Sequence, residues 1–321
     1  MEVPVDETSL KSELEKLRKD NAMLTLNVEE LTRTNEFLVT ATWREREMKQ
    51  RLHEALEELR ETKKLVDAQH KSITDSINYA SRIQHAIIPT EADIKRLFPD
   101  AFIYYEAKDI VSGDFPWIFH NGTFTYIAAV DCTGHGVPGA MMSLIGNLLL
   151  NDLAKHEEID PGSLLDHLHQ AVVKTLKQEE DGKQTSDGMD IALCRVDHRT
   201  REVQFAGAHR PLYHATGGDI RIYPGDKFPI GGNQYRGRTG FSNYSINPQA
   251  GECIYFFSDG LTDQFGGPDG LKFGPRRTRE ILLENLAQPM HEQHTQIRTA
   301  LQEWKKVTKQ TDDILLIGIK F

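Results

Sequence analysis

Leucine recurs every seven residues along the first part of this chain. The first members of the series are Leu10, Leu17, Leu24, Leu31 and Leu38. Apolar side chains at this spacing, with a second set four residues on, form one stripe along a helix, and the stripe is covered when two helices supercoil around each other. The repeat therefore predicts a long coiled-coil helix that joins two copies of the chain into a homodimer.

The limits of this helix are set by proline and glycine. Neither residue type occurs between Val5 and Ile88, so one continuous helix is allowed, and Pro89 predicts its end. At about 1.5 Å per residue such a helix could reach roughly 120 Å. Asn21 and Asn35 fall in the stripe, where asparagine favours a parallel pair in a fixed register. The alternative is a single charged helix that folds back on the rest of the chain.

Charge and cysteine content limit the class of protein. Aspartate and glutamate outnumber lysine and arginine by 48 to 38, and this excess argues against binding to nucleic acid or to anionic lipid. Cys132, Cys194 and Cys253 are odd in number, far apart and set among apolar residues, so we expect core thiols and a reducing compartment. The first residues carry no basic or apolar targeting segment, and no apolar stretch is long enough for membrane insertion. We expect a soluble, cytoplasmic protein.

From about residue 101 the sequence changes to short apolar runs separated by glycine-containing turns. Strand patterns occur at 102–106, 117–120, 123–130, 191–196, 202–206, 211–214, 254–257 and 314–319. Helical patterns occur at about 138–155, 163–178 and 275–309. Strands grouped as hairpins, with helices between the groups, predict an α+β domain of mainly antiparallel sheets. The predicted organisation is a helical segment at 1–90 and a globular domain at 91–321.

Aspartates occur where the predicted strands begin or end. They are Asp114, Asp131, Asp259 and the pair Asp312 and Asp313. A carboxylate at the end of a buried strand is held firmly and can still reach a cleft, and several together repel one another unless a cation neutralises them. Hard oxygen donors without a histidine or cysteine set favour magnesium or manganese over zinc. Each aspartate alone could instead serve a turn, but the glycine-rich turn after Asp131 favours a site.

Six segments, taken in order, resemble the motifs of one family. They are VSGDF at 111–115, AVDCTGHGVPGAMMS at 129–143, DGMDIALCRVD at 187–197, FAGAHRPLY at 205–213, FFSDGLTD at 256–263 and TDDILLI at 311–317. This series is similar to the SpoIIE branch of the metal-dependent serine/threonine protein phosphatases (PPM, the type 2C fold). The resemblance covers roughly residues 105–321. The segment SINYASRIQHAIIP at 76–89 is also similar to the helical linker that precedes such domains in signalling proteins.

The resemblance implies a β-sandwich flanked by helices, with two Mn²⁺ or Mg²⁺ ions in a cleft between the sheets. By motif position the metal-binding and catalytic residues would be Asp114, Asp131, Asp259 and Asp312, with the backbone carbonyl of Cys132 as a further metal ligand. The ions would activate a water molecule for attack on phosphorus, so no serine or cysteine nucleophile is needed. The absence of a GxSxG sequence and of a P-loop with lysine is consistent with this mechanism.

Further candidates near these motifs have competing structural interpretations. Lys108 could contact phosphate or be a solvated surface lysine. Asp187 and Asp190 could complete a third, weaker metal site, and one of them could instead cap the strand that follows. His209, with the neighbouring Arg210, could face the cleft and meet phosphate, or both could be solvated loop residues.

Two residues depart from the family pattern. Pro116 follows Asp114 closely, and because proline lacks a backbone donor and fixes φ, the strand after Asp114 could start differently. His135 lies four residues beyond Asp131 rather than in the short Asp-Gly-His arrangement of the family. We therefore assign His135 a structural or phosphate-proximal role instead of a catalytic one.

The motifs favour an enzyme that hydrolyses phosphoserine or phosphothreonine on a partner protein and is regulated through the coiled-coil linker. The resemblance implies a substrate of the bacterial anti-anti-sigma type. The second hypothesis is a catalytically weak or inactive dimeric signalling scaffold that keeps the fold as a binding surface. Asp114, Asp131, Asp259 and Asp312 are all present, and a degenerate scaffold has little reason to retain them. Manganese-dependent turnover of a small aryl phosphate separates the two hypotheses.

Overall fold

The computed structural model describes residues 7–156, 158–178, 186–232 and 240–321. Contacts within the chain define two compact units, Met1–Ile73 and Thr74–Phe321. The described strands all lie in the second unit. No helix in the described ranges combines the length and the apolar character needed to cross a membrane.

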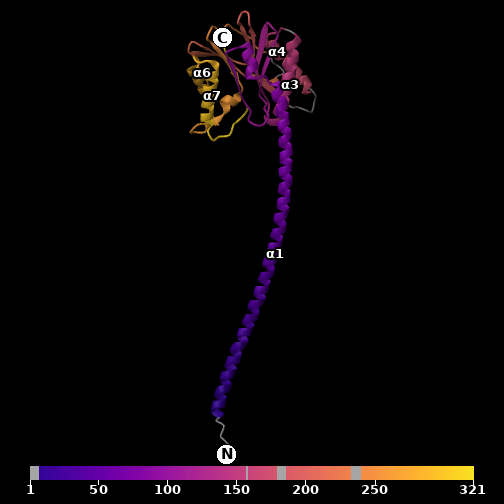
Figure 1. Ribbon diagram of the computed structural model, residues 1–321, viewed down its shortest axis with the longest axis vertical. Helices are drawn as coiled ribbons and strands as arrows, with labels where there is room; N and C mark the ends of the chain where they lie inside the picture. Colours follow the sequence, from indigo (N-terminus) through magenta and orange to yellow (C-terminus); the bar gives the residue numbers. More distant parts are fainter. Residues whose placement is uncertain (1–6, 157, 179–185, 233–239) are drawn as a thin grey trace, which may run out of the picture. The chain divides into compact units, whose positions relative to one another are not determined.

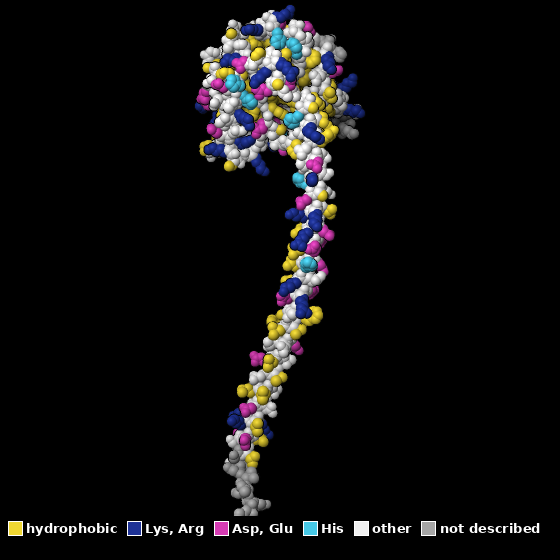
Figure 2. All heavy atoms as spheres, in the orientation of Figure 1, with side chains coloured by type: hydrophobic (Ala, Val, Ile, Leu, Met, Phe, Trp, Pro, Cys, Tyr) yellow, Lys and Arg dark blue, Asp and Glu magenta, His cyan; other side chains and the backbone are white. Residues whose placement is uncertain are grey.

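One helix, α1 (Glu7–Ile87), forms the first unit and extends into the sequence of the second (Figure 1). It is 81 residues long and ends just before Pro89, so the prediction of one continuous helix is confirmed. Its seam side chains from Leu10 to Ile73 are open to solvent: Leu17 is 63% exposed and Leu59 is 64% exposed. Figure 2 shows apolar side chains recurring between charged ones along this helix. Pairing of two such helices through the seam stays a prediction.

The second unit contains two main antiparallel sheets. The first has the strand order β1 (Ala101–Glu106), β13 (Ile314–Lys320), β10 (Cys253–Phe257), β6 (Leu212–Thr216), β7 (Asp219–Tyr223). The second has the order β2 (Phe115–His120), β3 (Phe124–Cys132), β4 (Gly188–Asp197), β5 (Val203–Ala208), β9 (Tyr244–Ile246), and β8 (Ile230–Gly231) pairs with β4. A small hairpin joins β11 (Phe265–Gly266) and β12 (Leu271–Lys272).

Helices cover the outer faces of both sheets, which gives the layer order helix, sheet, sheet, helix (Figure 1). The remaining helices are α2 (Glu91–Leu97), α3 (Gly136–His156), α4 (Pro161–Thr175), α5 (Asp259–Asp263), α6 (Gly274–Glu284) and α7 (Met290–Lys305). Helices α3 and α4 pack on the sheet that contains β2 to β5, and α6 and α7 pack on the sheet that contains β1 and β13. The predicted α+β fold with antiparallel sheets flanked by helices is confirmed.

Side chains of the central strands alternate between the two faces of the sheet and fill the space between the layers. In β3, Tyr126 and Ala128 face the α3 and α4 layer, whereas Ile127 and Ala129 face the opposite sheet. Because side chains of a strand alternate between its faces, a strand buried on both faces reads as a continuous apolar run. The apolar run that precedes Asp131 is therefore packed on both faces of the sheet. This packing holds the Asp131 carboxylate in place at the end of the strand.

Local differences from the sequence prediction have simple causes. The helical pattern at 275–309 is divided into α6 and α7, and Pro289 stands directly before the second helix. The short elements α2, β7 and β9 were not predicted because their apolar patterns are brief. Pro116 lies inside β2 opposite Ala129, and β2 is an edge strand, where a missing donor is tolerated.

Candidate functional site

A polar cavity of about 240 Å³ lies where the two sheets bring their strand ends together. Its lining is dominated by carboxylates and by the turn between β3 and α3. The lining residues are Asp114, Asp131, Cys132, Thr133, Gly134, His135, Asp190, Arg210, Asp259, Asp312 and Asp313. All of the residues that the sequence predicts as principal metal ligands are thus brought to one cavity.

One sheet supplies three of these carboxylates. Asp114 stands directly before β2, and Asp131 is the penultimate residue of β3. Asp190, on β4, is the cross-strand partner of Asp131. Like charges directly opposite each other on neighbouring strands repel, so the Asp131 and Asp190 pair requires a positive charge nearby.

The other sheet supplies the remaining carboxylates. Asp259 follows β10 as the first residue of α5, and Asp312 precedes β13. Strands β10 and β13 are neighbours, which places both motifs at the same edge. Residues more than a hundred positions apart in the sequence therefore meet because two packed sheets present corresponding strand ends.

Asp313 joins the two halves of the site through the backbone. It is only 3% exposed, and its two carboxylate oxygens accept hydrogen bonds of 2.8 Å from the backbone N–H groups of Lys108 and Gly113. Gly113 has no room for a side chain, since a Cβ there would lie 2.5 Å from the carbonyl oxygen of Gly134. Asp313 thus fixes the segment that carries Asp114, a role that the sequence did not indicate.

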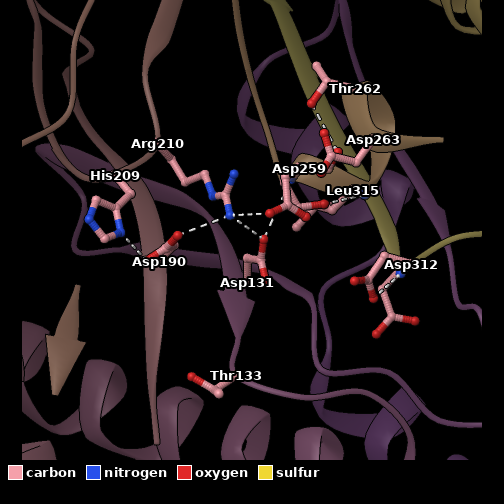
Figure 3. A network of polar contacts seen from close by, with 12 residues as sticks. Asp131, Thr133, Asp190, His209, Arg210, Asp259, Thr262, Asp263, Asp312 and Leu315 are labelled. Atoms are coloured by element: carbon pink, nitrogen blue, oxygen red, sulfur yellow. Dashed lines mark hydrogen bonds and ion pairs between the residues drawn. The ribbon is translucent and has the colours of Figure 1, made fainter. Parts of the chain in front are cut away.

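Arg210 supplies the positive charge that the carboxylates require (Figure 3). Its Nη2 atom lies 2.9 Å from Asp131, 3.0 Å from Asp190 and 2.7 Å from Asp259. The guanidinium thus contacts carboxylates from both sheets at once. The interpretation of Arg210 as a solvated loop residue is wrong, because its side chain is only 17% exposed.

The electrostatic environment opposes ionisation of two carboxyl groups in the cavity, Asp114 and Asp131. Burial, and then the charge of Asp131, raise the pKa of Asp114 well above its ordinary value, although a hydrogen bond from Ser258 acts in the opposite direction. Burial also raises the pKa of Asp131 to about 7, with Arg210 lowering it and the charges of Asp259 and Asp190 raising it. Burial is thus the main cause of both shifts, and neighbouring carboxylates add to it.

The residues present suit a hard divalent cation. The donors are carboxylate oxygens, and Asp114 Oδ2 is buried with no hydrogen-bond partner among the described residues, as expected of an oxygen available to a metal. Within the described ranges, no three acidic, histidine or cysteine side chains are already grouped around one point as metal ligands. Three of the carboxylates are instead grouped around the Nη2 atom of Arg210.

Of the weaker sequence candidates, Asp190 lines the cavity, whereas Lys108, Asp187 and His209 lie outside its lining. Lys108 lines an adjacent groove, and Asp187 is half-buried outside the lining. His209 reaches the cavity indirectly, through a 2.9 Å contact between its Nδ1 atom and Asp190. His135 does line the cavity, and its Nδ1 atom lies 2.8 Å from Asp109, a pairing between distant segments that no sequence pattern indicated.

The sequence profile of Stage II sporulation protein E (SpoIIE) matches residues 121–321, which is more than half of the chain. The chain belongs to the SpoIIE family. The match begins after Asp114. The assignment of Asp114 to the site therefore rests on its position in the cavity lining and on its own sequence motif. Within the SpoIIE family this globular unit is a serine/threonine phosphatase domain of the PPM fold.

Solved structures share the fold of this chain. The SiaA-PP2C domain of Pseudomonas aeruginosa is 32% identical, with 79% of this chain and 99% of that chain covered and a TM-score of 0.72. The PP2C phosphatase domain of SpoIIE from Bacillus subtilis, solved with a fragment of its regulatory domain, is 14% identical (69% and 63% covered, TM-score 0.57). The RsbU and RsbW domains of Rv1364c from Mycobacterium tuberculosis are 18% identical (70% and 60% covered, TM-score 0.54). Comparison with curated protein sequences gives no match.

Proposed function

We propose that this chain is an active, metal-dependent phosphatase that removes phosphate from phosphoserine or phosphothreonine on a partner protein. One observation carries the proposal. Asp131 from one sheet and Asp259 from the other lie 2.9 and 2.7 Å from the same cationic atom, Arg210 Nη2. The fold therefore brings carboxylates of both sheets onto one positive charge, as binding of a divalent cation between the sheets requires.

Asp114, Asp131, Asp259 and Asp312, with the carbonyl of Cys132, would hold two Mn²⁺ or Mg²⁺ ions. When bound, such ions supply an activated water molecule and neutralise charge on the phosphoryl group. Asp313 holds the backbone beside Asp114, so the ligand's position is fixed before any cation enters. The turn after Cys132 forms the wall of the cavity beside which a phosphate would be placed.

The alternative route through a covalent cysteine intermediate is disfavoured. Cys132 is the cysteine that contributes to the cavity wall, but it is only 4% exposed. Burial, together with the charges of Asp131 and Asp114, raises the pKa of its thiol well above the ordinary value. A thiol that stays protonated is a poor nucleophile, so attack by water is the better supported reaction.

Control through the helical linker is part of the proposal. Gln84 of α1 is 2% exposed and bonds to Ser112, two residues before Asp114. The exposed seam further along α1 supports a homodimer whose geometry would bias the linker. A phosphoprotein of the anti-anti-sigma type is the proposed substrate class, by resemblance to the family.

Hydrolysis of a small aryl phosphate tests the proposal. We expect turnover with Mn²⁺ or Mg²⁺ and none after chelation, and we expect phosphoserine and phosphothreonine peptides to be hydrolysed in preference to phosphotyrosine peptides. Asp269→Asn, in an exposed turn, is the matched control and should behave as wild type. No turnover with any divalent ion, together with no bound metal, would favour the inactive scaffold.

A further inference from the structure

Arg210 contacts its carboxylates in an unusual way for an arginine. A guanidinium in a structural ion pair commonly meets one carboxylate with two parallel N–H groups. Here a single nitrogen, Nη2, is shared by Oδ2 atoms of Asp131, Asp190 and Asp259, at 2.7–3.0 Å. One positively charged nitrogen is thus shared by three carboxylates, two of which are proposed metal ligands, and Figure 3 shows the guanidinium end directed at them.

The backbone of the β5–β6 loop is constrained so that it presents Arg210 to the cavity. His209 adopts a left-handed conformation with φ of 55°, which is unfavourable for a residue with a side chain. Its N–H donates to the carbonyl of Asp226 at 2.8 Å. Gly207 and Gly225 let the carbonyl of Arg210 approach so closely that a Cβ at either position would clash with it. Because the backbone is fixed, any movement of Arg210 is confined to its side chain.

These contacts do not satisfy every hydrogen-bond donor of the guanidinium. Its Nε atom is buried and has no hydrogen-bond partner among the described residues. The guanidinium of an arginine stays charged at physiological pH. A permanently charged side chain held mainly through one terminal nitrogen can leave the carboxylates when a stronger cation arrives.

We propose that Arg210 is a tethered cation that competes with a divalent metal ion for Asp131 and Asp259 and thereby lowers the metal affinity of the site. The inference rests on the proposed function, because it takes these carboxylates as metal ligands. A guanidinium and a metal ion on the same oxygens repel each other at short range in a partly buried site. Metal binding and the position of Arg210 are therefore coupled, and each reduces the occupancy of the other.

Removal of the charge at position 210 tests the competition. Isothermal titration calorimetry with Mn²⁺ compares wild type with Arg210→Gln, which is neutral and of similar length, and with Arg221→Gln as a matched control on the exposed side of β7. We expect Arg210→Gln to bind Mn²⁺ about tenfold more tightly or better, within the usual range of coupling between ligands, and Arg221→Gln to match wild type. Equal or weaker binding by a folded Arg210→Gln would overturn the inference.

A second measurement does not depend on the folding of that variant. In ¹⁵N-labelled wild type, the Nε–H resonance of Arg210, assigned through its loss in Arg210→Lys, should shift during titration with Mg²⁺ and share the midpoint of metal binding. A resonance that stays unchanged at saturating Mg²⁺ would show that the guanidinium does not move, and the competition would be refuted while the proposed function stands. If neither wild type nor Arg210→Gln binds a divalent ion, both the proposed function and this inference fail.

Discussion

Gln84 and Ser112 exchange two hydrogen bonds in the interior of the protein. The Gln84 side-chain amide donates to the Ser112 carbonyl at 2.7 Å, and the Ser112 N–H donates to the Gln84 side-chain oxygen at 3.2 Å. The Ser112 hydroxyl in turn accepts from the N–H of Asp114 at 3.0 Å. The last turns of α1 are therefore linked, through one serine, to the backbone of a proposed metal ligand.

Gln84→Ala should weaken this link. The N–H and carbonyl of Ser112 would stay buried without their partner, which costs about 1–3 kcal/mol in the free energy of unfolding. We expect the variant to unfold at lower temperature and to need more Mn²⁺ for half-maximal turnover. Gln69→Ala, the same change at an exposed position of the same helix, should have no effect on either quantity. An unchanged Mn²⁺ dependence in Gln84→Ala would make Gln84 a purely structural residue.

Deletion of residues 1–70 tests whether the coiled coil controls the site. We expect a largely monomeric protein with altered Mn²⁺ affinity and turnover per site, because the paired seam no longer biases the linker. A bias of about 1.4 kcal/mol would change the ratio of two linker packings about tenfold. Turnover measured against Mn²⁺ concentration for the full chain and for the truncation decides the matter. Superimposable curves would leave the coiled coil as a tether only.

Two seam isoleucines near the linker differ in their surroundings. Ile77 is half-buried and lines a groove with Val111 and Val137, whereas Ile87 is 42% exposed. Both residues lie in the predicted linker at 76–89, so a polar residue at either position is expected to alter activity. With the structure, we expect Ile77→Asn to change turnover more than Ile87→Asn, since only Ile77 lies against the segment that leads to Asp114. Equal effects in a steady-state assay would indicate that the seam, rather than the groove, transmits the change.

Substitution of the neighbouring residues Asp312 and Asp313 should affect different properties, namely turnover and stability. Asp312→Asn removes a proposed metal ligand, so we expect a large loss of turnover with little loss of stability. Asp313→Asn places an amide NH₂ opposite one of two backbone donors, so we expect mainly a lower free energy of unfolding. Denaturant unfolding and Mn²⁺-dependent turnover of both variants separate these outcomes. A larger loss of turnover in Asp313→Asn would shift the ligand assignment by one residue.

Stability in the presence of a chelator should depend on pH through Asp131. Its pKa is raised from 3.8 to about 7, so between these values the folded protein holds a proton that the unfolded chain has lost. The stability that this proton confers is complete below about pH 4 and is lost as the pH rises through about 7. The stability of Asp131→Asn relative to wild type should therefore increase from pH 4 to pH 7, and saturating Mn²⁺ should reverse the difference. A pH-independent difference in chemical unfolding would contradict the assigned environment.

The strands were predictable because each carries its own apolar pattern. The run at 123–130 and the run at 314–319 correspond to β3 and β13, and both are central strands packed on two faces. The short edge strands β7 and β9 have few apolar residues and depend on their neighbours for pairing. Local pattern therefore revealed the strands with longer apolar runs, including the edge strands β1 and β2, but not the short strands β7 and β9.

The residues of the site also divide into those predictable from local sequence and those that depend on tertiary contacts. Asp114, Asp131 and Asp259 were predictable as strand-end carboxylates, since that position is a property of the local sequence. The role of Arg210 was not, because it arises only where the β5–β6 loop meets carboxylates from both sheets. Its one sequence signal was the neighbouring His209 and Gly207 in FAGAHRP, a compact turn at the end of a strand.

Turnover of a phosphoserine peptide by Asp131→Asn and Asp259→Asn at saturating Mn²⁺, beside wild type and Asp269→Asn, tests the central claim most directly. Each of the first two changes removes one carboxylate from the site that joins the sheets, so we predict a loss of at least about 100-fold, or about 2.7 kcal/mol of transition-state stabilisation, with the fold retained. Asp269→Asn should equal wild type. Near wild-type turnover in Asp131→Asn or Asp259→Asn would contradict the assignment of these carboxylates as the catalytic metal site.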